Sequence, residues 1–214
     1  MNILKKEKNI ILLSVFIGTF ITLIFMLATK SYSYSVQKGI ADEVIRLHVL
    51  ANSDEMYDQQ LKIKVKDGIV KMLETQLHNS VSKDETRIIL LQNLDNIEKR
   101  AKEIIKENGY DYEVSAKITF DNFPTKQYAD VVLPAGEYEA LKIEIGEAKG
   151  QNWWCVMFPP LCFVDASVKE VPKKDKEILK GVLTDTEYDI VTKAKNEKDI
   201  PVKIKFKIVE MWQK

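Results

Sequence analysis

Gln151-Asn-Trp-Trp-Cys-Val-Met-Phe-Pro-Pro-Leu-Cys-Phe-Val-Asp165 contains two of the chain's three tryptophans and both of its cysteines. Residues 153–158 are apolar on both alternating faces, which predicts a strand covered on both sides. Pro159 and Pro160 stiffen the backbone between the two cysteines, so the chain after the strand is expected to be a rigid loop that returns toward it. Whether the thiols form a disulfide depends on the cellular compartment, and the N-terminus bears on that question.

The N-terminal residues 1–29 differ from everything that follows. Three lysines precede residues 10–28, a run without charge that is close to the roughly 20 residues needed to cross a bilayer. Lysines on the short side of such a run predict that this end stays in the cytoplasm and that the rest of the chain is exported. We therefore predict a signal peptide or signal-anchor helix over residues 1–29, a tether over 30–43 and an exported domain over 44–214.

Two questions about the exported chain stay open at this point. No Ala-x-Ala site follows the apolar run, so a signal-anchor is slightly favoured over a cleaved signal. In a non-reducing compartment Cys155 and Cys162 are expected to pair, and two buried free thiols remain the alternative.

The periodicity of the exported part predicts an α+β domain. Residues 44–51 alternate as a strand, and helical stripes follow to about residue 77 and then, after a Ser82–Glu85 capping box, to residue 108. Period-two segments at 112–120, 128–133, 141–145 and 153–158 predict an antiparallel meander, with short helices at 174–182 and 185–194 and a late strand over 202–208. We expect a two-helix hairpin packed on one face of a mainly antiparallel sheet.

Composition limits the classes of partner and cofactor. The formal net charge is zero and no basic patch dominates, so nucleic acid is not an expected partner. His48 and His78 lack metal-ligand spacing to a cysteine, and the glycines are scattered, without a phosphate-binding loop. The sequence therefore predicts no metal, no cofactor and no small-molecule substrate.

One dense polar cluster occurs at the end of the first predicted strand: Arg46, His48, Asn52 and Asp54. A hydrolase could use His48 as a general base. No Gly-x-Ser-x-Gly or similar nucleophile motif accompanies it, so we favour a structural network that holds the strand end against the following helix. No catalytic residue is assigned.

The best candidate for a partner-binding surface lies in the opening stretch and comprises Trp153, Trp154, Phe158, Pro159, Pro160 and Leu161. Tryptophans with aromatic neighbours often form binding hot spots. The alternative is that a tryptophan fills the core. Because neighbouring strand residues point to opposite faces, one tryptophan is expected to face the helices and the other the opposite side.

Two segments resemble the signatures of the stage II sporulation protein R family. The first is Ile45-Arg-Leu-His-Val-Leu-Ala-Asn-Ser-Asp54 with the helix after it, where Lys66 stands in place of an expected arginine. The second runs from Leu133-Pro-Ala-Gly136 to the Trp-Trp-Cys…Phe-Pro-Pro-Leu-Cys run that ends at Cys162. The resemblance covers the chain to about residue 165 and includes nothing after residue 166.

The resemblance implies an intercellular signal in an endospore former. Such a protein is made in the forespore and exported across its membrane into the intermembrane space. There it is expected to activate a membrane-embedded aspartic protease that processes the precursor of the mother-cell sigma factor E. The family supplies no catalytic residues to transfer. A secreted hydrolase that acts on cell wall or peptide, with His48 as base, is the alternative.

Overall fold

The computed structural model describes residues 2–163 and 170–194 of the chain. The chain divides into two compact units, and among the described residues the first consists of the helix α1 (Asn2–Glu43) as far as Val36. Within the described ranges, this helix is long and apolar enough, from Ile10 onward, to cross a membrane. Its composition fits a signal sequence or a membrane anchor, as the sequence predicts.

The second unit begins at Gln37, before the predicted domain start at residue 44. Residues 30–43, the expected tether, continue α1 as helix. In the last turns of this helix Ile40 and Ala41 are buried in the second unit. Lys83 Nζ donates to the Ala41 and Asp42 carbonyl oxygens at 3.1 and 2.9 Å. These bonds satisfy carbonyls that a helix end leaves without partners.

The described elements of this unit after α1 comprise helices, strands and one 3₁₀ turn. In chain order they are β1 (Ile45–Leu50), α2 (Met56–Asn79), α3 (Lys83–Gln92), α4 (Leu94–Glu107), β2 (Val114–Phe123), β3 (Lys126–Tyr128), β4 (Val131–Leu133), β5 (Gly136–Ile145), β6 (Asn152–Phe158), η1 (Leu161–Phe163), α5 (Lys173–Val182) and α6 (Asp185–Lys193). The α+β class is confirmed, and α5 and α6 lie where short helices are predicted. The predicted late strand at 202–208 lies outside the described residues.

The sheet has the order β2-β5-β1-β6, and β3 with β4 forms a separate hairpin. β1 pairs parallel with β5 and antiparallel with β6, while β2 pairs antiparallel with β5. The expected consecutive meander is thus wrong, because the first strand inserts between the last two. β1 is buried on both faces along most of its length, although Arg46 and His48 occupy one of them, and this burial suits a central position.

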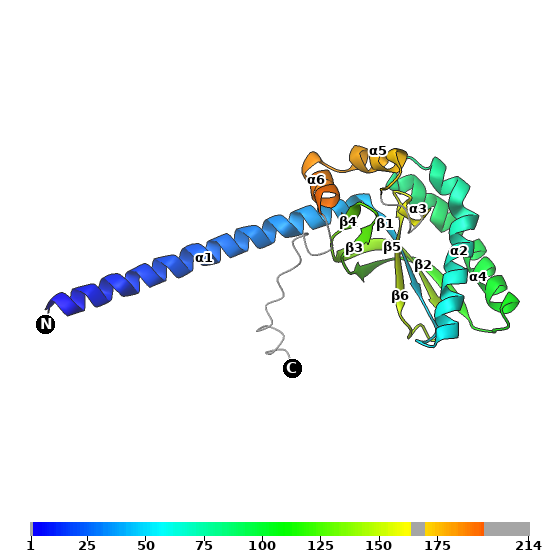
Figure 1. The fold of residues 1–214 in the computed structure, drawn as a ribbon, viewed down its shortest axis with the longest axis horizontal. Helices are drawn as coiled ribbons and strands as arrows, with labels where there is room; N and C mark the ends of the chain where they lie inside the picture. Colours follow the sequence, from blue (N-terminus) through cyan, green and yellow to red (C-terminus); the bar gives the residue numbers. More distant parts are fainter. Residues whose placement is uncertain (1, 164–169, 195–214) are drawn as a thin grey trace. The chain divides into compact units, whose positions relative to one another are not determined.

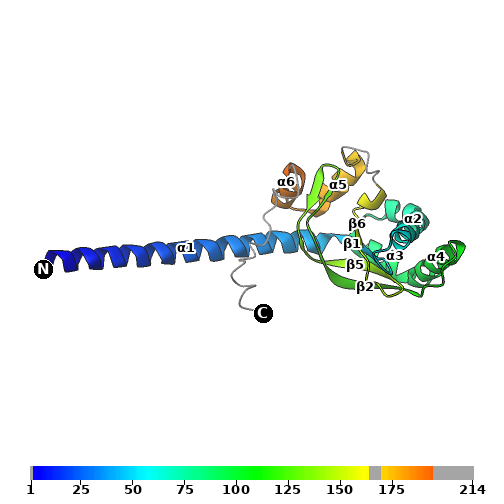
Figure 2. The same cartoon turned by 60° about the horizontal axis from the view of Figure 1, so that its bottom comes forward.

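Helices α2, α3 and α4 lie on one face of the sheet (Figures 1 and 2). The apolar stripe of α2 packs there as predicted, and α4 lies beside it. Core side chains from sheet and helices include Leu47, Val49, Leu61, Val65, Ile69, Leu90, Ile97, Ala101, Leu141 and Ile143. The odd-numbered residues of β1 and β5 face this layer, so their even-numbered neighbours face the other side.

The predicted second helix is interrupted at Asn93 and forms α3 and α4. The Asn93 side-chain amide donates to the Ile89 carbonyl at 2.8 Å and competes with the backbone for that acceptor. Ser82 caps α3 by accepting the Glu85 N–H, as predicted. The Glu85 carboxylate, however, accepts from the Val81 N–H and so closes the box one residue earlier than expected.

Candidate functional site

The structure divides the predicted polar cluster between two places. Arg46 and His48 point from β1 to the sheet face opposite α2 and α4, whereas Asn52 and Asp54 lie beyond the end of that strand. The four side chains therefore do not form one site. Each pair has partners from distant parts of the chain that the sequence analysis did not name.

His48 is buried, with 4% of its surface exposed, and both of its ring nitrogens are engaged. Nδ1 lies 2.8 Å from Asp121 Oδ2 of β2, and Nε2 lies 2.7 Å from Asn152 Oδ1 of β6. The ring also stacks on Trp154, with centroids 3.8 Å apart. A general base needs a ring nitrogen within reach of a substrate proton, and this arrangement leaves neither nitrogen free.

Asp121 links His48 to a row of charges across the sheet. Lys142 Nζ of β5 lies 3.1 Å from Asp121 Oδ2, and Glu144 lies beside Lys142. Burial acts to raise the pKa of the Asp121 carboxyl, but hydrogen bonds from His48, Lys142 and the Asn122 N–H outweigh it and hold that pKa below its usual value. The carboxylate is thus kept ionised as the centre of a structural network.

Arg46 is fully buried and lies in a box of aromatic rings. Its guanidinium carbon is 4.2 Å from the centroid of Phe123, 4.9 Å from that of Tyr138 and 5.8 Å from that of Tyr128. Nη2 donates to the Tyr128 hydroxyl at 2.6 Å, while Nε and Nη1 have no hydrogen-bond partner among the described residues. Burial also raises the pKa of Tyr138 to about 12. Ring faces thus take the place of a carboxylate around this cation.

Asn52 and Asp54 join the end of β1 to the loop between β5 and β6. Asn52 Oδ1 accepts the Glu147 N–H at 2.9 Å, and Asp54 Oδ1 accepts the Gln151 N–H at 2.7 Å. Asn52 Nδ2 also donates to Asp58 Oδ2 of α2 at 2.8 Å. These bonds hold the strand end against the following helix, the role favoured from the sequence, although Arg46 and His48 take no part in it.

The loop that this network holds also requires glycine. A Cβ on Gly150 would lie 2.1 Å from the Ser53 carbonyl oxygen, and Gly146 has a φ of +58°. Gly150 therefore leaves no room for a side chain. Gly146 adopts the left-handed backbone conformation, which favours glycine. Part of the second resemblance segment is therefore explained by backbone packing.

The Trp-Trp-Cys…Phe-Pro-Pro-Leu-Cys run is mostly inside the fold. Cys155 and Cys162 form a disulfide that ties β6 to the following 3₁₀ turn. Phe158, Pro159, Pro160 and Leu161 are buried, so the folded domain does not offer them to a partner. The rigid return loop expected from the two prolines thus serves the core, which restricts the candidate interface to the tryptophans.

The two tryptophans point to opposite faces, as predicted from the strand period. Trp154 is half-buried against His48, whereas Trp153 is 37% exposed beside α2. Lys66 Nζ of α2 lies 4.7 Å from the centroid of the Trp153 ring, a cation–π contact. An exposed tryptophan with a cation at its face is the part of the predicted surface that a partner can reach.

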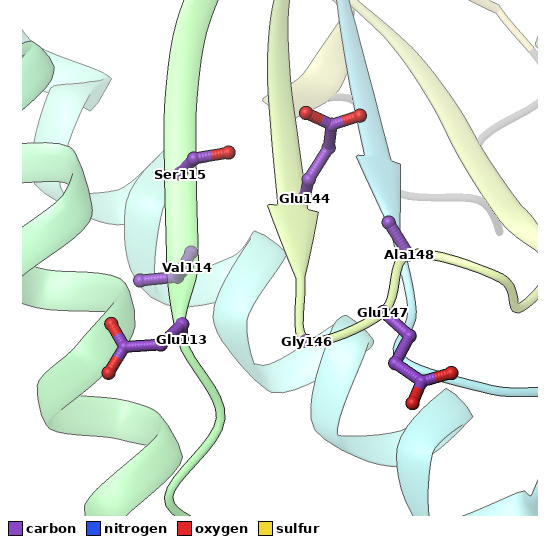
Figure 3. Close-up of a pocket in the computed structure, with 7 residues that line it drawn as sticks. All are labelled: Glu113, Val114, Ser115, Glu144, Gly146, Glu147 and Ala148. Carbon is purple, nitrogen blue, oxygen red and sulfur yellow. The ribbon is translucent and has the colours of Figure 1, made fainter.

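A surface depression lies where β2 begins and β5 ends (Figure 3). The carboxylates of Glu113, Glu144 and Glu147 point in different directions from its wall (Figure 3). Each one pairs with a lysine, at distances of 2.7–2.8 Å. In the described part of the chain, moreover, no group of His, Cys, Asp and Glu side chains is arranged to hold a metal ion.

Comparisons with known proteins identify relatives of the chain. A family model described as stage II sporulation protein R matches residues 41–168. The protein named stage II sporulation protein R from Bacillus subtilis (strain 168) is 40% identical over 180 residues, which cover 80% of this chain and 80% of that protein. No solved structure matches the chain.

Proposed function

Because the chain belongs to the stage II sporulation protein R family, we propose that it is an exported sporulation signal that activates a membrane-embedded aspartic protease. The protease would process the precursor of the mother-cell sigma factor E. The signal would thereby link gene expression in the forespore to that in the mother cell.

The N-terminal helix supports the exported topology. Lys5, Lys6 and Lys8 precede its apolar run, the arrangement that keeps the short end in the cytoplasm. The domain from Gln37 onward would then enter the space between forespore and mother cell, either anchored or released. The Cys155–Cys162 disulfide fits a compartment that does not reduce it.

The engagement of His48 is the observation that favours a signal over a hydrolase. A hydrolase would need an accessible base next to a nucleophile or a metal. Here His48 is buried, and its two nitrogens bond to Asp121 and Asn152. We therefore assign the network to stability and the activity to binding.

Trp153 is the side chain that we place at the contact with the protease. It is large, partly exposed and held by the cation–π contact with Lys66, so little conformational freedom would be lost on binding. Interface tryptophans of this kind cost about 2 kcal/mol or more when truncated to alanine. That loss corresponds to roughly 30-fold in affinity.

The test is reconstitution in a host that does not sporulate. The exported protein, the protease and the sigma-factor precursor are produced together, and precursor cleavage is read on a gel. We expect cleavage only when protein and protease are both present, and we expect Trp153→Ala to reduce it at least tenfold. Met56→Ala, which removes a side chain that is 75% exposed at the start of α2, is the matched control and should leave cleavage unchanged.

The other outcomes of this experiment are equally informative. Cleavage with this protein in the absence of the protease would make the chain the enzyme and restore the hydrolase alternative. Undiminished cleavage with Trp153→Ala, in a chain shown to be folded, would exclude Trp153 from the contact while leaving the activation itself established.

A further inference from the structure

β2 is the edge strand at one margin of the four-stranded sheet, where β5 is its neighbour (Figure 1). Just before this strand, the Glu113 carbonyl accepts the Gly146 N–H at 2.8 Å, so the odd-numbered residues bond to β5. In an antiparallel pair alternate residues direct their N–H and C=O groups to the same neighbour. The even-numbered residues of β2 therefore direct these groups to the outer edge.

This outer edge is capped at two positions and open between them. The Ala116 N–H donates to Glu98 Oε1 at 2.7 Å, and the Asn122 N–H donates to Asp121 Oδ1 at 2.8 Å. Within residues 2–163 and 170–194, the outward amides of Ile118 and Phe120 have no such partner. Unpaired edge amides are a template for another strand, and the caps limit this one to a short central segment.

An exposed aromatic side chain lies on the open segment itself. Phe120 is 67% exposed. Its cross-strand neighbour on β5 is Glu139, which Arg87 of α3 holds by a hydrogen bond. Soluble domains usually protect an edge strand with charge rather than expose a phenylalanine on it.

We propose that this edge pairs with β2 of a second copy of the chain, antiparallel and about a two-fold axis at Thr119. In that register Ile118 faces Phe120 of the other copy, and the two open amides lie in hydrogen-bonded pairs. Lys117 faces Asp121 of the other copy, a favourable cross-strand pair of opposite charge. Thr119 faces Thr119 of the other copy. Lys117 Nζ bonds to Glu144 Oε2 at 2.8 Å within one chain, and because the Lys117 side chain is 53% exposed it can turn to Asp121 of the other copy.

The neighbouring registers are less complementary. An axis at residue 118 would place Phe120 opposite Ala116, whose amide Glu98 already caps. An axis at residue 120 would place Lys117 opposite Phe123, which is buried against Arg46. With the axis normal to the sheet, the helical layers of both copies lie on the same side.

A symmetric cysteine cross-link tests this register in the full chain in membranes. Thr119 lies in a non-hydrogen-bonded pair, where facing Cα atoms are about 4.5 Å apart, within the range of a disulfide. Thr119→Cys is expected to give a disulfide-linked dimer under mild oxidation, seen on a non-reducing gel. Ser115→Cys, which is exposed on the same strand and face, should not cross-link, because its two copies would be about 27 Å apart.

A second variant distinguishes cross-linking through this strand pairing from cross-linking by random collision of two chains. Adding Phe120→Ser to Thr119→Cys should reduce the amount of cross-linked dimer at least tenfold. Light scattering of the unchanged chain in detergent should give twice the protomer mass. Equal cross-linking at positions 115 and 119, or none at position 119 in a folded chain, overturns the proposal. A cross-linked band of any mass other than two chains would assign the edge to a different protein and also overturns it. The readout involves no protease, so it is independent of the proposed function.

Discussion

Arg46 shows how aromatic rings can accommodate a buried charge. Removing a guanidinium from water is costly unless its surroundings compensate, and two of its nitrogens make no hydrogen bond to the part of the chain that the structure describes. Three aromatic rings surround the cation, and each cation–π contact contributes about 0.5–2 kcal/mol. The residue was placed correctly on the polar side of its strand from alternation alone. Its box was not predicted, because the rings come from positions 123, 128 and 138.

Glu139, on the helix-facing side of the sheet, allows a pH-dependent test of how much a buried ion pair stabilises the fold. The Arg87 guanidinium bonds to this buried carboxylate and, with Lys83, outweighs burial to lower its pKa. A lowered folded-state pKa stabilises the fold above the usual glutamate value, about 4.3, and this stability is lost as the pH falls through the folded-state pKa. We expect Glu139→Gln to lower the free energy of unfolding by about 1.5–3 kcal/mol at pH 7. The further loss of stability at acid pH should then be smaller than in the unchanged chain.

Urea unfolding at a series of pH values between 7 and 3 measures this effect. Glu137→Gln is the matched control, since Glu137 is exposed on the same strand two residues away. The control should change the free energy of unfolding little at any pH. If Glu139→Gln keeps the full acid dependence of the unchanged chain, the buried ion pair is not its source.

At the scale of elements, local periodicity predicted most segments but not their arrangement. The strand over residues 112–120 and the helix to residue 77 followed from apolar repeats of two and about three and a half residues, which depend on near neighbours. The break at Asn93 was missed because Leu90, Leu94, Ile97 and Ala101 continue one apolar stripe across it. Sheet order was missed because the parallel pairing of β1 with β5 joins residues more than ninety positions apart.

The candidate site was predictable to a similar degree. The sequence identified Arg46 and His48 as one polar strand face. His48 meets Asn152 only because β6 pairs with β1, and it meets Asp121 only because β2 pairs with β5, the neighbour of β1. An alternating pattern extended past residue 120 could have placed Asp121 on the polar face of its strand. No local signal indicates that Pro159 and Pro160 are buried, because composition alone does not distinguish an aromatic loop that binds a partner from one that closes the core.

Gly68 tests how tightly two of these helices pack. A Cβ at this position of α2 would lie 2.2 Å from Ile104 Cδ1 of α4, so Gly68→Ala forces α4 or its side chain to move. Alanine gains about 1 kcal/mol in helix propensity, whereas overpacking costs about 1–3 kcal/mol. We expect net destabilisation, measured as a lower midpoint of thermal unfolding.

Gly181 in α5 supplies the matched control for that substitution. In the described ranges nothing lies within 4 Å of a Cβ at this position, so Gly181→Ala should raise stability by up to about 1 kcal/mol. Opposite changes in stability from two chemically identical substitutions would identify the contact between α2 and α4 as the cause. Stabilisation by Gly68→Ala would mean that α2 and α4 are more loosely packed than their side-chain distances indicate.

At the scale of the whole molecule, the boundary between export segment and domain lies inside α1. Ile40 is fully buried in the second unit, Ala41 is nearly so, and Lys83 holds the carbonyls at the end of the helix. Burial of an isoleucine side chain contributes about 1.5–3 kcal/mol. An unrelated cleavable export signal joined at Gln37 should therefore release a domain as resistant to protease and urea as the full chain. The same signal joined at Val44 should release one that is less stable by about 2 kcal/mol or more. Both chains keep every strand of the sheet, so a difference between them would come from residues 37–43. Equal stability of the two released domains would show instead that these turns belong to the export segment alone.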